Sequence, residues 1–149
     1  MDVVAGLSRD LIEHGLGWRW TPARVRAAMN AADCNLAIAI GRDGSSGAET
    51  TAGFGLMVYK DDEAHLSLLA VATRWQRRGV ARGLVRWLER CALTAGIGIV
   101  RLEARAGNRD ALAFYASLGY QPVRRVRGYY LGREDAQQLA RDLWLLPVD

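Results

Sequence analysis

The stretch LAVATRWQRRGVARGL, residues 69–84, carries the strongest structural signal in the chain. Apolar residues end a strand, a polar loop follows, and Gly79 opens a helix. Backbone N–H groups in the first turn of a helix have no acceptor within the helix, and the helix dipole adds partial positive charge there. Gly79 has no side chain to block an approaching anion, and arginines lie at positions 77, 78 and 82. The stretch therefore predicts a site for a phosphate or pyrophosphate group.

The loop alone does not identify a ligand. A helix that begins with a glycine and carries solvated arginines, without any ligand, would show the same residues, so a lone glycine-containing loop is weak evidence for an anion site. No GKS or GKT follows, which excludes a Walker loop, and the GxGxxG fingerprint is absent. The strands before the loop also alternate like antiparallel hairpins, unlike the parallel strands of a Rossmann fold.

Periodicity and turn residues predict a single α+β domain over residues 1–149. Thr21 and Pro22 are an N-cap and a first helical residue, and Gly96 is a helix end. The expected order is a helix at 22–32, strands at 35–40, 51–59 and 64–72, a helix at 79–95, a strand at 99–106, a helix at 108–118, and strands at 120–126 and 138–144. We expect four charged residues on the solvent side of the helix at 79–95, namely Arg82, Arg86, Glu89 and Arg90.

Composition narrows the classes of ligand and compartment. The net charge of +4, from 20 basic and 16 acidic residues, suits a phosphate-bearing cofactor, whereas nucleic-acid binding usually has a stronger basic excess and a recognisable module. We therefore expect no nucleic-acid partner. Cys34 and Cys91 have no CxxC spacing, so we expect no metal site. The start is unlike a signal peptide, and no apolar run approaches the ~20 residues of a spanning helix, so we expect a cytoplasmic protein without membrane contact.

Residues 76–81, QRRGVA, match the Q/R-x-x-G-x-G/A pattern of the GNAT superfamily of N-acetyltransferases, and they stand between a Leu-Ala-Val strand end and an amphipathic helix. The resemblance implies a mixed, mostly antiparallel sheet with one splayed parallel strand pair, flanked by helices, and acetyl-CoA as the acetyl donor. A bulge in the strand at 64–72 would produce the splay. The implied cofactor contacts are backbone groups of Leu69, Ala70 and Val71 for the pantetheine arm, and amides of Arg77, Arg78, Gly79, Val80, Ala81 and Arg82 for the pyrophosphate.

The second half of the chain resembles the RimI branch, the bacterial N-terminal acetyltransferases of ribosomal proteins. The similar segments are LEARAGN at 102–108, ALAFYASLGY at 111–120, RGYY at 127–130 and GREDA at 132–136, with Trp20-Thr21 upstream. By this resemblance Glu103 is the general base, acting either directly or through a water molecule, Tyr115 is the general acid and Asn108 a cofactor contact. The amine attacks the thioester directly in a ternary complex. Trp20, Tyr129 and Tyr130 would line the acceptor groove. The preferred acceptor is a protein N-terminus, with a small amine or a non-catalytic CoA-binding sensor as alternatives, in a monomer or homodimer.

Most of these residues also have a purely structural interpretation. Glu103 shares a strand face with Arg101 and Arg105 and could belong to a self-paired charge ladder. Tyr115 could be a core residue beside Phe114. Asn108 could cap a helix, and the two tyrosines at 129 and 130 could pack across a β-hairpin. His65 begins a strand, and we expect a partly exposed edge residue there rather than a catalyst.

Overall fold

The computed structural model describes residues 21–145. Trp20 and the extreme N-terminus therefore lie outside the described residues. The helices within this range are α2 (Pro22–Asn30), the 3-10 turn η2 (Thr73–Trp75), α3 (Val80–Thr94) and α4 (Arg109–Ser117), and the strands are β1 (Cys34–Arg42), β2 (Glu49–Lys60), β3 (Glu63–Val71), β4 (Ile99–Arg105), β5 (Gln121–Tyr130) and β6 (Glu134–Asp142). The order of helices and strands agrees with the prediction.

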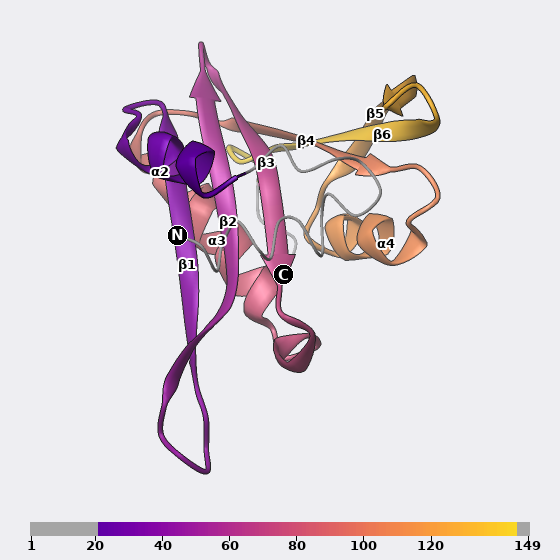
Figure 1. Cartoon of the computed structure of the whole chain (residues 1–149). Coiled ribbons are helices and arrows are strands. Elements are labelled where there is room, and N and C mark those ends of the chain that lie inside the picture. Colours follow the sequence, from indigo (N-terminus) through magenta and orange to yellow (C-terminus); the bar gives the residue numbers. More distant parts are fainter. Residues whose placement is uncertain (1–20, 146–149) are drawn as a thin grey trace.

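The strands form a mixed six-stranded sheet in the order β1-β2-β3-β4-β6-β5. All neighbouring strands are antiparallel except β3 and β4, which are parallel. Figure 1 shows that the long β1–β2 hairpin extends beyond the rest of the sheet. The predicted α+β class and the single parallel strand pair are both confirmed.

A bulge in β3 separates the two parallel strands. Leu56 pairs with Leu68, but the next residue, Met57, pairs with Leu66, so Ser67 is an extra residue in β3. Strands β3 and β4 are in register only from Glu63–Ile99 to His65–Arg101. A bulge bends its strand and locally disrupts the ladder. The remainder of β3, from Leu66 to Val71, therefore diverges from β4, and the predicted splay is confirmed.

Two hydrophobic clusters cover the two faces of the β1–β3 half of the sheet. Helix α3 packs its buried Leu84, Val85 and Leu88 on one face, and α2 packs Val25 and Ala28 on the opposite face. Figure 1 shows α2 and α3 on opposite sides of these strands. Full burial of each large aliphatic side chain stabilises a fold by about 1.5–3 kcal/mol. These two layers hold β3 and the start of α3, which carry the predicted anion site, in a fixed relation.

Two boundaries near the C-terminus differ from the prediction. Strand β5 continues to Tyr130, and β6 begins at Glu134 rather than at 138. Leu131 and Gly132 adopt positive φ angles of 54° and 69°, so the segment turns tightly into a hairpin. A β-bulge lies between Val126 and Tyr130. The RGYY segment is therefore the end of a strand instead of a loop.

Glu89 is buried, although the sequence predicts it on the solvent side of α3. Its residue exposure is 3%. Its Oε1 accepts hydrogen bonds from Arg86 Nη1 and Arg141 Nη1, both at 2.8 Å, and its Oε2 accepts one from the Tyr120 hydroxyl at 2.8 Å. A buried carboxylate requires such partners. Local sequence does not predict this burial, because one of the partners, Arg141, lies in β6 and is 52 residues away in sequence.

Candidate active site

The predicted anion site has an uncapped helix start. Gly79 is the N-cap of α3 with φ +81°, no side chain caps the helix, and no acidic residue lies in its first turn. A Cβ added to Gly79 would meet nothing within 4 Å, so the space beside this residue at the start of α3 is open. Arg77 also has a left-handed φ, of 61°. The first-turn amides of Val80 and Ala81 have no acceptor within the helix, and together with this open space they fit a pyrophosphate group.

The rest of the QRRGVA motif shapes this loop. Gln76 Nε2 donates a hydrogen bond to the Val71 carbonyl at 3.1 Å, which ties the loop to the end of β3. The guanidinium of Arg78 lies 5.1 Å from the centroid of the Trp75 ring, and that of Arg74 lies 5.2 Å from it. Arg78 can thus present its backbone amide to an anion while its side chain stacks on an indole. The sequence pattern indicated neither the hydrogen bond of Gln76 to Val71 nor the stacking of Arg78 on Trp75.

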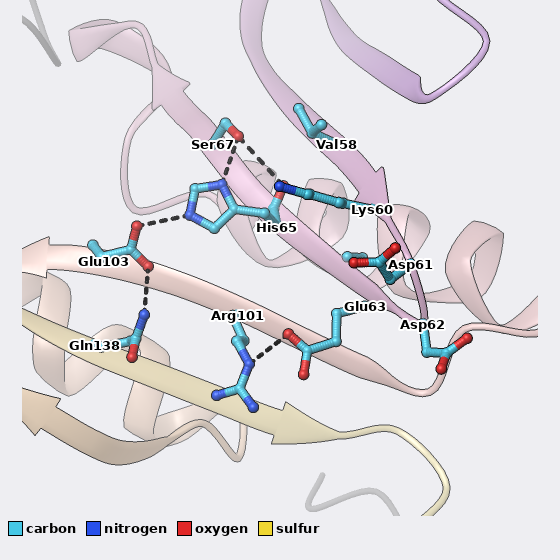
Figure 2. Close-up of a pocket in the computed structure, with 11 residues that line it drawn as sticks. Val58, Lys60, Asp61, Asp62, Glu63, His65, Ser67, Arg101, Glu103 and Gln138 are labelled. Atoms are coloured by element: carbon cyan, nitrogen blue, oxygen red, sulfur yellow. Dashed lines mark hydrogen bonds and ion pairs between the residues drawn. The ribbon is translucent and has the colours of Figure 1, made fainter.

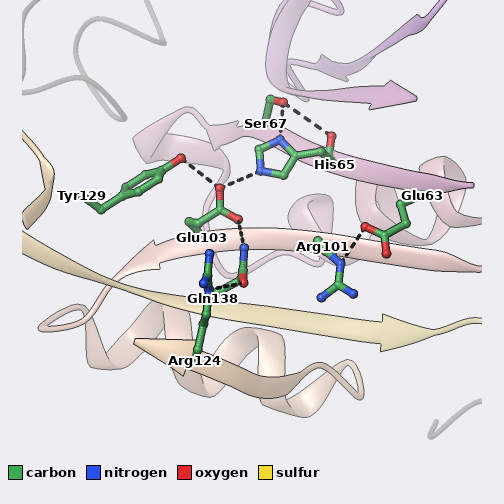
Figure 3. Close-up of polar contacts among 8 residues, drawn as sticks. All are labelled: Glu63, His65, Ser67, Arg101, Glu103, Arg124, Tyr129 and Gln138. Atoms are coloured by element: carbon green, nitrogen blue, oxygen red, sulfur yellow. Dashed lines mark hydrogen bonds and ion pairs between the residues drawn. The ribbon is translucent and has the colours of Figure 1, made fainter. Parts of the chain in front are cut away.

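Glu103 projects from β4 and has three hydrogen-bond donors around its carboxylate (Figure 3). His65 Nε2 lies 2.8 Å from Oε1, the Tyr129 hydroxyl donates to Oε1 at 2.9 Å, and Gln138 Nε2 donates to Oε2 at 3.5 Å. Burial on its own would raise the pKa of Glu103. The hydrogen bond and charge of His65, with the bonds from Tyr129 and Gln138, outweigh burial and hold that pKa below its usual value. Glu103 is therefore ionised at neutral pH.

The arginines on either side of Glu103 bind other carboxylates. Arg101 Nε donates to Glu63 Oε2 at 2.7 Å, and Arg105 Nη1 donates to Glu134 Oε1 at 3.0 Å. The Glu103 side chain is only 9% exposed. Glu103 is therefore not one charge of a solvated ladder along β4, and its own partners come from β3, β5 and β6.

His65 contacts the candidate base Glu103, and sequence analysis did not anticipate this contact. Its Nδ1 lies 2.7 Å from Ser67 Oγ, and its Nε2 contacts Glu103. The imidazole is 41% exposed, as expected for this position, but it belongs to an interior strand. The contact depends on the parallel register that sets His65 opposite Arg101, and no local pattern predicts that register. The alternation His65-x-Ser67 was the one available signal, because it places both side chains on one strand face.

A pocket of about 650 Å³ opens beside these residues (Figure 2). Glu103, His65, Ser67 and Gln138 line one end, and the β2–β3 turn, residues 60–63, lines the other. The pocket lies where β3 and β4 begin to diverge. A molecule in it can approach the Glu103–His65 pair directly.

Tyr115 lies in α4 with its ring against two other aromatic rings. The ring centroids of Phe114 and Tyr120 are 5.1 and 5.7 Å away. Burial, and to a lesser extent the neighbouring Tyr130, raise the pKa of Tyr115 far above its ordinary value. Within residues 21–145, no hydrogen bond joins Tyr115 to Glu103. Tyr115 is thus part of an aromatic cluster, and its phenol keeps its proton across the neutral range.

The remaining predicted site residues within the described range lie at the start of α4 and at the end of β5. Asn108 caps α4, because its Oδ1 accepts from Ala111 N at 3.1 Å. Tyr129 and Tyr130 end β5 with ring centroids 4.9 Å apart, so they pack against each other within one strand. Tyr129, 48% exposed, binds Glu103. Burial, followed by the charge of Glu103, raises the pKa of Tyr130 to about 12.

The sequence of this chain is similar to those of known acetyltransferases. The model of the acetyltransferase (GNAT) family matches residues 9–120. The chain belongs to the GNAT family. It is 39% identical over 88 residues to the [ribosomal protein bS18]-alanine N-acetyltransferase of Escherichia coli strain K12, covering 57% of this chain and 60% of that protein. It is also 38% identical over 71 residues to the N-terminal acetyltransferase B complex catalytic subunit naa20 of Schizosaccharomyces pombe, covering 48% of this chain and 39% of that protein.

A solved structure supports the same fold for this GNAT chain. The crystal structure of the ribosomal-protein-S18-alanine N-acetyltransferase from Escherichia coli superposes with a TM-score of 0.68 at 29% identity, over 91% of this chain and 81% of that chain. The sequence match spans about 60% of the E. coli relative's length. Among residues 21–145 no group of three or more His, Cys, Asp or Glu side chains could hold a metal ion. No helix in that range is both long and apolar enough to cross a membrane.

Proposed function

We propose that this protein transfers the acetyl group of acetyl-CoA to a primary amine, and that the amine is the α-amino group of a protein N-terminus. The observation that carries the proposal is the Glu103–His65 pair, 2.8 Å apart, at the point where β3 and β4 diverge. Acetyl transfer needs an amine that has lost a proton and a group that accepts the next one. An ionised carboxylate hydrogen-bonded to an imidazole, at the edge of an open pocket, supplies that group.

The acceptor class follows from the strength of this base. Free α-amines titrate near 7.7–8.0 and lysine near about 10.4, so roughly a tenth of an α-amine and under about a thousandth of a lysine is neutral at pH 7. Glu103 has a lowered pKa, so it is a weak base suited to the first acceptor. The relatives' names, which refer to an alanine of ribosomal protein bS18 and to an N-terminal acetyltransferase complex, support the same class.

Acetyl-CoA would supply the acetyl group, whose carbonyl carbon bonds to the amine nitrogen as its bond to the thiol sulfur breaks. The first-turn amides of Val80 and Ala81, which have no acceptor within α3, and the open space at Gly79 support a site for its pyrophosphate on residues 77–82. The part of β3 that is unpaired with β4, including Leu69, Ala70 and Val71, would bind the pantetheine arm through its backbone. Asn108 would add a contact from its cap position. Tyr115, which keeps its proton, would act as the acid beside the leaving sulfur.

The acceptor would lie between the Glu103 pocket and the end of β5. Tyr129 and Tyr130 would form apolar walls with hydrogen-bonding tips, and Trp20 would complete the groove from outside the described residues. The pocket extends from Glu103 to the β2–β3 turn, which favours an extended, chain-like acceptor over a small amine. We expect the reaction to proceed in a ternary complex, in the cytoplasm, with the protein as a monomer or homodimer.

Calorimetric titration with acetyl-CoA, using desulfo-CoA and ATP as comparison ligands, tests the donor site. We expect micromolar binding of acetyl-CoA that ATP does not reproduce. A panel of N-terminal peptides, with matched peptides that carry lysine behind a blocked N-terminus, then tests the acceptor. Absence of acetyl-CoA binding would remove the proposal. Acetylation of lysine alone would retain the enzyme and overturn the acceptor class.

A further inference from the structure

Glu103 already accepts three hydrogen bonds from side chains of this site. Its Oε1 already receives two hydrogen bonds, from His65 Nε2 and the Tyr129 hydroxyl. Its Oε2 faces Gln138 Nε2 at 3.5 Å. Its pKa is below the ordinary carboxyl value, so it holds a transferred proton weakly. A group that contacts Glu103 is therefore a better acceptor for the proton of the amine than Glu103 itself.

The hydrogen bonds assign the protons on His65. An ionised carboxylate only accepts hydrogen bonds, so the proton between His65 and Glu103 belongs to Nε2. In the neutral imidazole the lone pair then lies on Nδ1. The atom facing Nδ1 is Ser67 Oγ, at 2.7 Å. The basic nitrogen of this site is thus directed at Ser67, on the side away from Glu103 (Figure 3).

Ser67 is exposed to the acceptor by the bulge in β3. It is the one residue of β3 that the register with β2 skips, and its side chain lines the same pocket as His65 and Glu103. A hydroxyl can donate one hydrogen bond and accept others at the same time. Ser67 Oγ lies 2.7 Å from His65 Nδ1 and 3.5 Å from the His65 carbonyl oxygen, so Nδ1 is the closer acceptor for its proton. Ser67 can therefore donate to His65 Nδ1 while its oxygen accepts a hydrogen bond from an amine in the pocket.

We propose that Ser67 relays the proton of the acceptor amine to His65, so that the base of this site is the chain Ser67–His65–Glu103. This inference rests on the proposed acetyltransferase function. As the amine nitrogen bonds to the acetyl carbon, its N–H bond breaks and a bond from that proton to Ser67 Oγ forms. The original O–H bond of Ser67 breaks, and the proton binds His65 Nδ1. The resulting imidazolium is stabilised by the Glu103 carboxylate at 2.8 Å and later returns its proton to water.

The protonation of His65 can be read without an acceptor. The chain has two histidines, His14 and His65, so ¹⁵N NMR of the imidazoles with a His14→Asn variant assigns His65 unambiguously. We expect the neutral form to carry its proton on Nε2, and the Nδ1 resonance to move in Ser67→Ala. A neutral His65 with its proton on Nδ1 would overturn the relay.

The kinetic test compares Ser67→Ala with Ser67→Thr, which keeps the hydroxyl, and with Ser46→Ala in the β1–β2 turn as a matched control. We expect Ser67→Ala to lower turnover about tenfold or more with unchanged acetyl-CoA affinity, and Ser67→Thr to restore it. Turnover in mixtures of H₂O and D₂O should give a curved proton inventory in wild type, because two protons move, and a straight one in Ser67→Ala. A structural role of Ser67 would not straighten it.

Glu103→Gln separates failure of the relay from failure of the site. If Glu103→Gln loses turnover while Ser67→Ala keeps the wild-type rate and the curved inventory, the relay is wrong and the site stands. If both variants keep the wild-type rate, Glu103 is not part of the catalytic site, and both the proposed function of this site and the proton relay are excluded.

Discussion

The imidazole of His65 lies 2.8 Å from the carboxylate of Glu103, although the two residues are 38 positions apart and belong to different strands. His65 is the last residue of β3 that pairs with β4, and Glu103 lies two residues beyond its partner Arg101. The contact lowers the pKa of Glu103 and connects that residue to Ser67 through the imidazole.

Replacing Glu103 with Gln keeps the shape of the side chain and removes its charge. We expect turnover to fall by about 10²-fold or more, because general-base catalysis contributes effects of that size, while acetyl-CoA affinity stays near wild type. Steady-state kinetics and calorimetry measure the two effects. Glu49→Gln, in an exposed pair with Arg42, is the matched control and should change neither. An unchanged turnover number for Glu103→Gln would move the base elsewhere.

The lowered pKa of Glu103 makes part of the stability depend on pH. A carboxyl whose pKa is lower in the folded than in the unfolded state stabilises the fold above its unfolded pKa, near about 4.3. That contribution disappears as the pH falls through the lower folded pKa. We expect His65→Phe, which removes the largest lowering influence, to raise the pKa of Glu103 and flatten this part of the profile. Urea unfolding from pH 7 to pH 3 measures it, and parallel profiles for both proteins would contradict it.

Tyr115 should remain a hydrogen-bond donor well into the alkaline range, because burial raises the pKa of its phenol. We expect the maximal rate to show no loss from ionisation of Tyr115 up to about pH 10, the ordinary value of tyrosine. Tyr115→Phe should lower turnover by about 10²-fold with little effect on the acceptor KM. Tyr59→Phe is a control outside the proposed catalytic residues. A Tyr115→Phe enzyme with wild-type turnover would exclude the acid role.

Two glycines, one in the proposed donor site and one just beyond it, test the proposed pyrophosphate site. Gly79 has φ +81° and open space at its Cβ position. We expect Gly79→Ala to cost about 1 kcal/mol in stability and to weaken acetyl-CoA binding, since the new methyl group occupies the open space at the start of α3. Gly83 lies one turn later in α3, also with open space, so Gly83→Ala should stabilise the helix by about 0.8–1 kcal/mol. Equal acetyl-CoA affinities in both variants would argue against the proposed pyrophosphate site.

The buried Glu89 should be among the most sensitive polar positions for folding. Glu89→Ala leaves Arg86 and Arg141 without their shared carboxylate, and breaking a buried ion pair from one side costs about 3–5 kcal/mol. Glu49→Ala in the exposed pair with Arg42 should cost under about 1 kcal/mol. Chemical denaturation of both variants checks the contrast. A loss of under about 1 kcal/mol for Glu89→Ala would mean that the two guanidinium groups find water or other partners.

Local sequence was sufficient for most of the fold and for part of the site. The helix start at Gly79 and the alternation of 64–72 are local patterns, and each element formed where its pattern lies. The family resemblance added the splay and the choice of Glu103. What could not be predicted depends on register between distant segments: His65 against Glu103, and Arg141 against Glu89. The extension of β5 to Tyr130 was not predicted for a similar reason. The Asp135 carboxylate, which accepts a hydrogen bond from Gly128 N in this part of β5, belongs to the neighbouring strand β6.

The sheet consists of two antiparallel halves, β1–β2–β3 and β4–β6–β5, joined only at Glu63–His65 and Ile99–Arg101. His65 belongs to one half and Glu103 to the other. The three-residue pairing of β3 with β4 therefore sets both the width of the gap between the halves and the contact of the imidazole with the carboxylate. A substitution that shifts this pairing should change both together.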